Sequence, residues 1–574
     1  MELCSQISAA RAQDEAELVL RGGRLINVFS GELEVADVAI SEGVVVGVGP
    51  GYSGREEVDV SGCYLCPGLI DAHMHLESSQ VTVPEFARAV VPHGTTAVVL
   101  DPHEIANVHG LAGVQYLLDS RRGVPMSVFM MAPSCVPATS METAGAELTA
   151  QDLAPLWDEP GVIGLGEMMN FPGVLWCDPE VMAKLAEARR RGLIIDGHCP
   201  GLTGTDLNAY IAAGIDSDHE ATQAEEAAEK LRRGMYVVMR EASSARNLAD
   251  LVPLVTPANS RRCCFGTDDR HPGDLLSEGH VDHLVRRAIE LGLEPVTAVQ
   301  MATLNAAERF GLDRQGYGAI APGWRADILV LTNMKMFHVK HIYHAGRLVA
   351  EDGAMLADLP AAPAYLPPSM NINWDGFSGL AVAAPAGGKI RVIEAVDGQI
   401  VTGQSIAAAR LQDGLAVADP DRDLLKLAVI ERHRATGNIG LGFVRGFGLK
   451  RGALAGSVAH DSHNLIAVGA NDEDMLRAVR EIEKAGGGQI AVADGEVLAM
   501  LALPIAGLMS DRPLSAVHEA AEALAAAARE LGCGLTAPFM TLSFLALPVI
   551  PALKLTDKGL VDVEQFEIVP LWAE

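Results

Sequence analysis

The chain has 574 residues, and its 44 Lys and Arg against 74 Asp and Glu give a formal charge of −30 at pH 7. This charge has the wrong sign for binding a phosphate backbone, and aromatic residues make up 5% of the chain, so a nucleic acid partner is not expected. The length exceeds that of one typical domain, which predicts more than one.

The N-terminal segment, residues 1–17, lacks the basic start and the apolar stretch of a signal peptide. The nine cysteines are scattered rather than spaced as a disulfide framework, and Cys63 and Cys66 fall in an apolar run where we expect buried thiols. Both observations favour a reducing compartment and hence a cytoplasmic protein.

Two stretches of short β runs flank the middle of the chain. The first covers residues 17–51, and the second begins near residue 318 with the same Gly-rich turns. Short apolar runs bounded by such turns are typical of strands. We therefore predict that residues 1–62 and 318–358 pair with each other in one small β domain.

Between the flanks, apolar runs alternate with helical patterns. Helices are predicted at 179–191 and 207–213, and Gly192 and Gly234 stand where helices would end. Such repetition predicts a parallel sheet closed into a (β/α)8 TIM-like barrel over residues 63–317, with active-site residues at the C-terminal ends of the strands. The predicted strands are residues 63–73, 95–101, 125–132, 161–167, 192–198, 214–219, 235–241 and 262–268.

Six metal-type side chains stand at the ends of these strands: His73, His75, Glu167, His198, His219 and Asp268. His73 and His75 lie two residues apart, so both project from one face of their strand. Taken singly, Asp268 could cap the next segment, Glu167 could be a solvated strand end, and the later histidines could be ordinary buried residues. Their joint occurrence at successive strand ends indicates a site.

The number of these side chains bears on how many ions they hold. Six ligands exceed the three or so that a single catalytic ion takes from a protein, so we predict two divalent ions. Four histidines and two carboxylates accommodate Mn, Fe or Zn, and the sequence does not choose among them.

Several strings around the six residues carry a family resemblance. Together with the run PGLIDAHMH at residues 67–75, they resemble the metal-dependent amidohydrolase superfamily and, within it, the bacterial adenine deaminases. The resemblance extends through nearly the whole chain, including the C-terminal third. The strings are LESS at 76–79, DPHEIANV at 101–108, GHCPGL at 197–202 and GTDDRH at 266–271.

The resemblance implies a reaction and a small-molecule substrate. The reaction is hydrolytic deamination of adenine to hypoxanthine and ammonia, with a hydroxide activated by two metal ions as nucleophile. Asp268 would accept the proton of the attacking water and pass it on as a general acid. The resemblance also implies that the small β domain is a β-sandwich built from both flanks.

The resemblance further implies a division of the ligands. Many relatives carry a carboxylated lysine at the bridging position, where this chain has Glu167. The implied ligands are His73, His75 and Asp268 for one ion and His198 and His219 for the other, with Glu167 bridging the two.

Four more polar residues are candidates for contacting the purine or for tuning a metal ligand: Glu77, His103, Glu104 and Asp269. His103 and Glu104 open a His-Glu-x-x-Asn string, which misses the zinc-protease motif by its last residue. The alternative for Glu104 is a favourable electrostatic position at a helix N-terminus.

The C-terminal third has its own pattern. A Pro- and Ala-rich passage at 359–368 predicts a linker, and residues 371–574 predict a separate α/β domain with an Ala-rich helix at 515–531. The most apolar region, 537–555, contains three prolines, so we expect buried strands or loops there rather than a membrane span.

One polar loop of that third, residues 457–464, allows two interpretations. A hydrogen-bonded turn is favoured, because histidines outside the main set are weak evidence for a site. The alternative is that His460, Asp461 or His463 reaches the barrel mouth and closes the site or binds a further ion.

Two rival functions stay open. The same barrel and metals hydrolyse cyclic amides in dihydroorotase-like and hydantoinase-like relatives, and a non-catalytic scaffold of this fold would be recognised by missing ligands. As for most enzymes, a symmetric homo-oligomer is expected.

Overall fold

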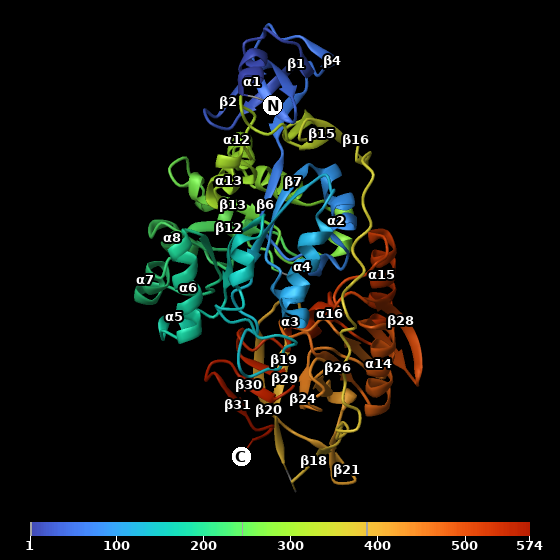
Figure 1. Cartoon of the computed structure of the whole chain (residues 1–574). Coiled ribbons are helices and arrows are strands. Elements are labelled where there is room, and N and C mark those ends of the chain that lie inside the picture. Colours follow the sequence, from blue (N-terminus) through green and yellow to red (C-terminus); the bar gives the residue numbers. More distant parts are fainter. Residues whose placement is uncertain (1–2, 244, 386–387, 574) are drawn as a thin grey trace.

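The computed structural model describes residues 3–243, 245–385 and 388–573. Figure 1 shows three regions stacked along one axis. The strands of the two flanks lie at the top, the predicted barrel lies in the middle, and the C-terminal third lies at the bottom. The two ends of the chain are therefore far apart (Figure 1).

The two flanks of the barrel segment join one sheet. Its strands run in the order β17-β16-β15-β14-β5-β1-β2-β3, with β4 beside β1. Antiparallel pairing of β14 with β5 connects the flanks and places Ile328 opposite Pro67. The two flanks therefore share one sheet, in which β5, predicted as part of the barrel, lies between β1 and β14. The strands are β1 (Ala16–Asn27), β2 (Glu32–Ser41), β3 (Val44–Val48), β4 (Gly54–Asp59), β5 (Tyr64–Pro67), β14 (Ile328–Asn333), β15 (His338–His344), β16 (Arg347–Glu351) and β17 (Ala354–Met355).

The apolar core of this sheet draws on both flanks. Leu18 and Leu20 of β1 alternate along the strand and belong to one buried cluster with Ile328 and Val330 of β14. Alternate residues of a strand point to the same face, so one face of the sheet is apolar. On another part of the sheet, Ala9 of α1 (Leu3–Ala10) joins a smaller buried cluster.

The first predicted barrel strand, residues 63–73, is wrong in extent because it is two strands. Tyr64–Pro67 forms β5 of the flank sheet, and Leu69–Met74 forms β6 of the barrel. Gly68 lies between them, and a Cβ there would come within 2.0 Å of Thr96 Oγ1. Only glycine fits where the chain changes from one sheet to the other.

The middle region is α/β with a curled parallel sheet, as expected for a TIM-like barrel. Its strands form two hydrogen-bonded arcs, β10-β9-β8-β7-β6 and β11-β12-β13, with parallel pairing throughout. They coincide with the predicted strands to within a few residues, apart from the split first strand. Their bounds are β6 (Leu69–Met74), β7 (Thr95–Leu100), β8 (Ser127–Ala132), β9 (Val162–Met168), β10 (Ile194–Gly197), β11 (Ser217–Asp218), β12 (Tyr236–Arg240) and β13 (Cys263–Gly266).

Two local contacts connect the arcs. Between β13 and β6, the backbone N–H of Asp268 donates to the carbonyl of His73 at 2.9 Å, beside a parallel bridge between Met74 and Asp268. Between β10 and β11, the N–H of Gly197 donates to Ser217 Oγ at 3.1 Å. These contacts bring the C-terminal ends of all the strands to one rim.

Helices follow the strands as the sequence predicts. The helix predicted at 179–191 has those bounds, and Gly192 ends it with φ +67°, whereas the helix predicted at 207–213 begins earlier, at Gly204. The helices are α2 (Val83–Val90), α3 (His103–His109), α4 (Leu111–Ser120), α5 (Phe171–Leu175), α6 (Pro179–Arg191), α7 (Gly204–Ala212), α8 (Ala224–Arg232), α9 (Leu248–Leu251), α10 (Pro272–Ser277), α11 (Val281–Glu290), α12 (Pro295–Ala302) and α13 (Leu304–Phe310).

A long connection leads to the C-terminal third. Residues 356–381, which include the predicted linker, form neither helix nor strand, and Figure 1 shows this segment passing down the outside of the molecule. Its extended path carries the chain past the barrel to the opposite end of the molecule.

The C-terminal third contains a mainly antiparallel sheet in the order β20-β19-β24-β23-β26-β25-β27-β28, with β32 beside β19. Parallel pairing occurs between β19 and β24. Among the described residues, the strands from β18 to β26 follow one another with no α-helix between them, so the expected alternation of strands and helices holds only in part. The elements are β18 (Val382–Ala383), β19 (Lys389–Ala395), β20 (Thr402–Ala408), β21 (Arg410–Gln412), β22 (Leu415–Val417), β23 (Leu425–Ile430), β24 (Ile439–Arg445), β25 (Ala453–Gly456), β26 (Leu465–Gly469), α14 (Asp472–Ala485), β27 (Gly488–Ala493), β28 (Glu496–Ala502), α15 (Leu514–Glu530), α16 (Pro538–Phe544), β29 (Leu553–Thr556), β30 (Gly559–Asp562), β31 (Glu567–Val569) and β32 (Trp572–Ala573).

Two predictions for this third have different outcomes. The Ala-rich helix predicted at 515–531 is α15, and Gly532 follows it with φ +101°. The expectation of strands or loops in residues 537–555 is wrong at its start, where α16 begins at Pro538. Proline favours the first position of a helix, because its missing N–H has no partner there in any case.

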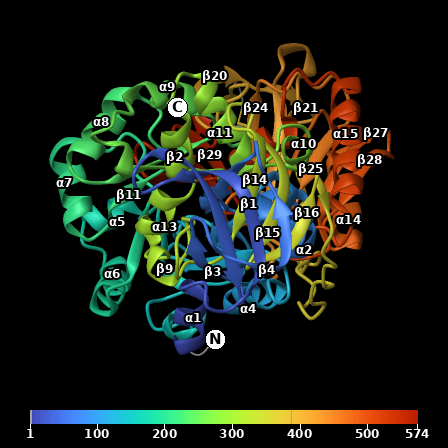
Figure 2. The same ribbon diagram turned by 90° about the horizontal axis from the view of Figure 1, so that it is seen from above.

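Figure 2 views the molecule from above the flank sheet, with α6, α7 and α8 at one edge and α14 and α15 at the opposite edge. Among the described residues, no helix combines the length and the apolar character that crossing a bilayer requires. All nine cysteines are unpaired, and Cys66 is buried as predicted while Cys63 is partly buried.

Candidate metal centre

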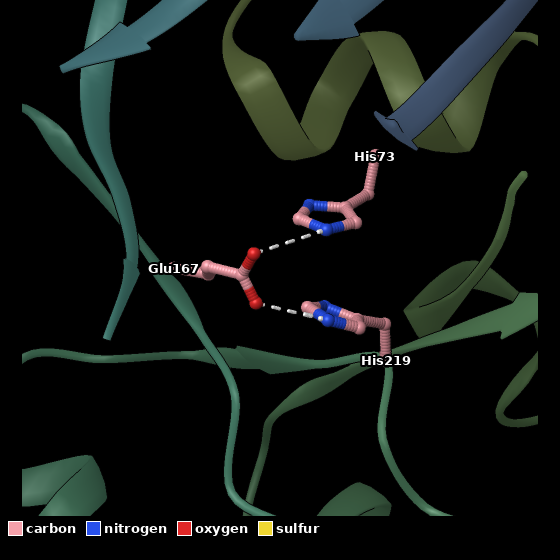
Figure 3. Close-up of side chains that lie close together, drawn as sticks. All are labelled: His73, Glu167 and His219. Carbon is pink, nitrogen blue, oxygen red and sulfur yellow. Dashed lines mark ion pairs between the residues drawn. The ribbon is translucent and has the colours of Figure 1, made fainter. Parts of the chain in front are cut away.

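The six predicted metal-type residues lie together, and Glu167 is at their centre. Its Oε1 is 3.8 Å from His73 Nε2 and 3.2 Å from His75 Nε2. Its Oε2 is 2.7 Å from His198 Nδ1 and 3.2 Å from His219 Nε2. Figure 3 shows His73 and His219 approaching the two oxygens from one side. Each oxygen of Glu167 thus faces its own pair of histidines.

Asp268 completes the group from the end of β13. Its Oδ1 lies 3.3 Å from His75 Nε2, and its Oδ2 accepts a hydrogen bond from Arg240. The residue adopts φ +56°, a left-handed conformation that Asp tolerates better than most residues. In this conformation the chain turns away from the strand at Asp268, and the carboxylate stays at the rim.

The electrostatics of the cluster depend on its burial. Burial raises the pKa of Glu167, but hydrogen bonds from His198 and His219 outweigh it and hold that pKa well below its usual range. Burial lowers the pKa of His75, but Asp268 and Glu167 outweigh it and hold that pKa well above its usual range. The site therefore has a strongly negative potential and favours a cation at the histidines.

The hydrogen bonds behind the histidines show whether a metal fits. His75 Nδ1 is 3.0 Å from the carbonyl oxygen of Asp101, and His73 Nδ1 is 3.0 Å from Asp196 Oδ2. Each Nδ1 must therefore carry the proton, which leaves an unprotonated Nε2 in the neutral ring. His73 Nε2 is buried without a hydrogen-bond partner, and both Nε2 atoms face carboxylate oxygens.

A lone pair that faces a carboxylate oxygen is repelled unless a cation or a proton lies between them. Such second contacts behind metal-binding histidines fix the ring and its tautomer. Around Glu167 there are four groups whose ligand atoms lie within 4.8 Å of one another and fit a divalent ion. These groups are His73 with His75 and Asp268, His73 with Glu167 and His219, His75 with His103 and Glu167, and His198 with His219 and Glu220.

A cavity opens beside the metal-type residues. Three of the four further candidates line it: His103, Glu104 and Asp269. His103 Nδ1 is 3.4 Å from Glu167 Oε1, and burial raises the pKa of Glu104 to about 8. Glu77 is different, because its Oε1 accepts a hydrogen bond from the N–H of Ile105 at 2.9 Å. Among the residues that line the cavity, Glu77 is absent, and this contact gives it a role in holding the start of α3.

Two charged residues at the cavity were not among the predicted site residues. Arg240 Nη1 lies 2.5 Å from Glu220 Oε1, its Nη2 lies 2.9 Å from Glu220 Oε2, and it also binds Asp268. Burial raises the pKa of Glu220, but Arg240 outweighs it and lowers that pKa below its usual range. A signal was present, since Arg240 is the next-to-last residue of the predicted strand 235–241 and Glu220 directly follows His219.

Asp101 is a third residue that was not among the predicted site residues. Its Oδ2 accepts from the N–H of Glu167 at 2.8 Å, and its Oδ1 accepts from the N–H of His103 at 3.2 Å. Its own carbonyl orients His75, as described above. The strand end at Asp101 thus supports three cavity residues at once.

The other wall of the cavity comes from the C-terminal third. His460 and Asp461 line the cavity together with the barrel residues, so the favoured interpretation of this loop as a mere turn is wrong. Four apolar side chains accompany them: Ile400, Phe544, Leu547 and Ile550. Local sequence carries no signal for this contact, because about 190 residues or more separate the loop from the strand ends it meets.

Comparison with known proteins relates both walls to one group. Residues 64–349 match the family described as Amidohydrolase family, and residues 399–567 match the Adenine deaminase C-terminal domain. The chain is 51% identical to the adenine deaminase of Desulfatibacillum aliphaticivorans over 99% of both chains. It is 50% identical to that of Dehalococcoides mccartyi strain CBDB1, again over 99% of both. An adenosine deaminase structure from Xanthomonas campestris with bound zinc matches at 17% identity and TM-score 0.45, over 60% of this chain and 95% of that one.

Proposed function

The chain belongs to the adenine deaminase family of amidohydrolases, and from that premise we propose that the cluster around Glu167 holds two divalent ions for the hydrolysis of adenine to hypoxanthine and ammonia. Relatives that share about half of its residues over their full length are adenine deaminases. The chain is therefore a hydrolytic enzyme, and adenine is its substrate.

One observation carries the proposal for the metal centre. His73 and His75 each have Nδ1 occupied by a hydrogen bond and turn Nε2 toward carboxylate oxygens. Two such nitrogens facing Glu167 favour cations between them. Because Glu167 Oε1 faces one histidine pair and Oε2 the other, the geometry supports a bridging role for Glu167.

When bound, two divalent ions would lower the pKa of a water held at the cluster, so that hydroxide would be present near neutral pH. The ligands we propose are those implied by the family resemblance: His73, His75 and Asp268 for one ion, His198 and His219 for the other, and Glu167 for both. The donor set accommodates Mn, Fe or Zn.

Asp268 is the proposed proton carrier. Arg240 occupies its Oδ2, which keeps the carboxylate ionised and leaves Oδ1 toward the cluster. Oδ1 then takes the proton of the water that attacks carbon 6 of adenine. Asp268 returns this proton to the ring or to the amine, and the bond between carbon 6 and nitrogen breaks to release ammonia.

The rest of the cavity suits a small planar base. We propose that His103, Glu104 and Asp269 contact purine nitrogens, because they line the cavity beside the cluster. The apolar side chains from the C-terminal third, such as Phe544, would cover the ring and exclude bulk water.

The decisive experiment combines metal analysis with a panel of substrates. The protein is purified with its native metals, ions per chain are counted, and ammonia release is followed with adenine while hydantoin and dihydroorotate test the cyclic-amide alternative. We expect two ions per chain and turnover of adenine alone. Turnover of a cyclic amide in place of adenine would favour the rival enzyme, and full activity with one ion per chain would contradict the binuclear centre.

The remaining assignments are proposals of the same kind. Residues 1–62 with 318–358 would form a β-sandwich, residues 63–317 the barrel and residues 371–574 a separate domain. The shared sheet of the flanks supports this division, except that β5 (Tyr64–Pro67) belongs to the flank sheet rather than to the barrel. Unpaired cysteines support a cytoplasmic location. A symmetric homo-oligomer without a nucleic acid or membrane partner is proposed on general grounds.

A further inference from the structure

The loop of residues 457–464 approaches Glu104, which stands in the first turn of α3 and lines the cavity. His463 Nε2 is 3.4 Å from Glu104 Oε2, and His460 Nδ1 is 4.0 Å from the same oxygen. Glu104 is 1% exposed and His463 is fully buried. The contact therefore joins the barrel to the C-terminal third in the interior of the molecule.

The backbone decides which nitrogen of His463 carries the proton. The N–H of Ala459 donates to His463 Nδ1 at 3.2 Å. Burial lowers the pKa of His463 well below its usual range, and His460 lowers it further, so the ring is neutral and has one proton. Because Nδ1 accepts a hydrogen bond, the proton is on Nε2, which faces Glu104.

This tautomer argues against a third metal ion. Glu104, His460 and His463 lie close enough to hold a cation. A metal would need the lone pair of His463 Nε2, but that nitrogen carries the proton while the N–H of Ala459 occupies Nδ1. His463 thus turns an N–H toward Glu104 Oε2 rather than a lone pair, although at 3.4 Å this contact does not have the geometry of a hydrogen bond.

The loop is held firmly enough to orient its partner. The fully buried Arg432 donates to the carbonyl oxygens of His463, Ser369 and Ala506. Asn464 Nδ2 donates at 2.8 Å to the carbonyl oxygen of Thr143, which belongs to the barrel segment. His463 is therefore fixed relative to both regions that form the cavity.

We propose that His463 is a positioning residue for deamination: its Nε2–H faces the carboxyl group of Glu104 at 3.4 Å and by electrostatic attraction keeps it in the orientation that meets the substrate. The inference rests on the proposed contact of Glu104 with the purine. Ser78 Oγ lies 3.3 Å from the other oxygen, Oε1, and 2.6 Å from Asp269 Oδ1, so the carboxyl group is approached from two sides. Positioning of this kind acts through Glu104 and predicts that the two residues are energetically coupled.

A double-mutant cycle tests the proposal. The variants are His463→Ala, His463→Gln, Glu104→Gln and the combination of His463→Ala with Glu104→Gln, each assayed for kcat and KM with adenine, for ions per chain and for thermal midpoint. We expect His463→Ala to lower kcat/KM by about 10-fold or more, because the N–H that faces the carboxyl group is lost. His463→Gln keeps an N–H donor near the same place and should recover most of the loss. In the Glu104→Gln background, His463→Ala should change kcat/KM by less than about 2-fold.

A matched control separates positioning from general damage to the loop. His433 is a partly buried histidine, and its Nε2 lies 2.7 Å from the carbonyl oxygen of Ser462 in the same loop, but it does not line the cavity. His433→Gln should lower the thermal midpoint and leave kcat/KM within about 2-fold of the wild type.

Several results would overturn the inference. These are additive effects of the two substitutions, a loss with His463→Gln as large as with His463→Ala, or a third ion per chain that disappears with His463→Ala. If His463→Ala does not fold, His463→Gln and its combination with Glu104→Gln provide the test. A wild-type protein that lacks two ions or adenine turnover would instead contradict the proposed function, so the two failures are distinguishable.

Discussion

The barrel and the C-terminal third form opposite walls of one cavity and manage buried charge in different ways. The barrel wall concentrates histidines and carboxylates that compensate one another, with Glu167 among four histidines and Arg240 between Glu220 and Asp268. The C-terminal wall is mostly apolar, as at Phe544 and Ile550. One wall is suited to chemistry, and the other is suited to covering a flat ring.

Two buried lysines that do not line the cavity differ in the same way. Lys230 of the barrel pairs with Asp218 at 2.9 Å and with Glu226 at 2.6 Å. Lys554 of the C-terminal third has no ion pair among the described residues and donates to the carbonyl oxygens of Ile400 and Phe544 at 2.8 and 2.9 Å. The charge of Lys230 is compensated, whereas Lys554 is stabilised as a neutral donor that connects two residues of the cavity wall.

The largest effect is expected from a substitution at the centre of the barrel wall. Glu167→Ala removes both oxygens that face the histidines, so metal content should fall below two ions per chain and ammonia release from adenine should fall to background. Metal analysis and an ammonia assay provide the measurement. Glu241→Ala, at the end of β12 and outside the cavity lining, is the control and should keep both ions. Full two-ion occupancy in Glu167→Ala would show that the residue has another role.

Asp268→Asn keeps the size of the side chain but removes the proton acceptor. We expect kcat to fall by roughly 100- to 10,000-fold, the range for general acid–base groups. The thermal midpoint should change little, since Arg240 keeps its partner Glu220. Asp282→Asn, another buried carboxylate that hydrogen-bonds His93 and Arg286, should affect the midpoint instead of kcat. Unchanged ammonia release by Asp268→Asn would remove the proposed mechanism.

The C-terminal wall should be more tolerant. Phe544 stacks on His460 with ring centroids 4.5 Å apart and planes at 16°. Phe544→Leu keeps an apolar side chain but loses the flat surface, so KM for adenine should rise by about 2- to 10-fold with a smaller change in kcat. Steady-state kinetics measure both. Phe447→Leu, a fully buried phenylalanine away from the cavity, should cost stability and leave KM unchanged. An equal rise in KM for both variants would show that the effect is not local.

The smallest effect is expected in the pH dependence of stability, where the two buried lysines should differ. Burial lowers the pKa of Lys554 to about 7 from an ordinary value of 10.5. The unfolded chain then binds more protons than the folded one between pH 7 and 10.5, so Lys554 contributes stability that increases as pH rises through this window. Lys554→Met should therefore lose more stability relative to the wild type at pH 9 than at pH 7, by roughly 1–3 kcal/mol, because the wild type's cost of deprotonating this buried lysine on folding falls as pH rises.

Thermal midpoints of the wild type, Lys554→Met and Lys230→Met at pH 7, 8 and 9 provide the test. In Lys230, burial lowers the pKa, but Asp218 outweighs it and raises that pKa above its ordinary value. Its titration therefore lies above this window, and the difference between Lys230→Met and wild type should stay constant from pH 7 to 9. A flat difference for Lys554→Met as well would mean that Lys554 remains charged in the folded protein.

Much of the barrel could be predicted because its information is local. Each strand is an apolar run that ends in a polar residue, and parallel strands bring such ends to one rim. His73, Glu167 and Asp268 therefore lie together as the spacing suggested, although their role as ligands is still a proposal. The error at residues 63–73 arose because an unbroken apolar run does not reveal that the chain changes sheets at Gly68.

By itself, the sequence determined the order of strands and helices, the residues at the strand ends and, through resemblance, the family. Only the tertiary structure decided that His460, Asp461 and Phe544 share the cavity with those strand ends and that His463 faces Glu104. The physical reason is the range of the interactions. Periodicity reports which face of an element is buried, but it carries no information on which distant element covers that face.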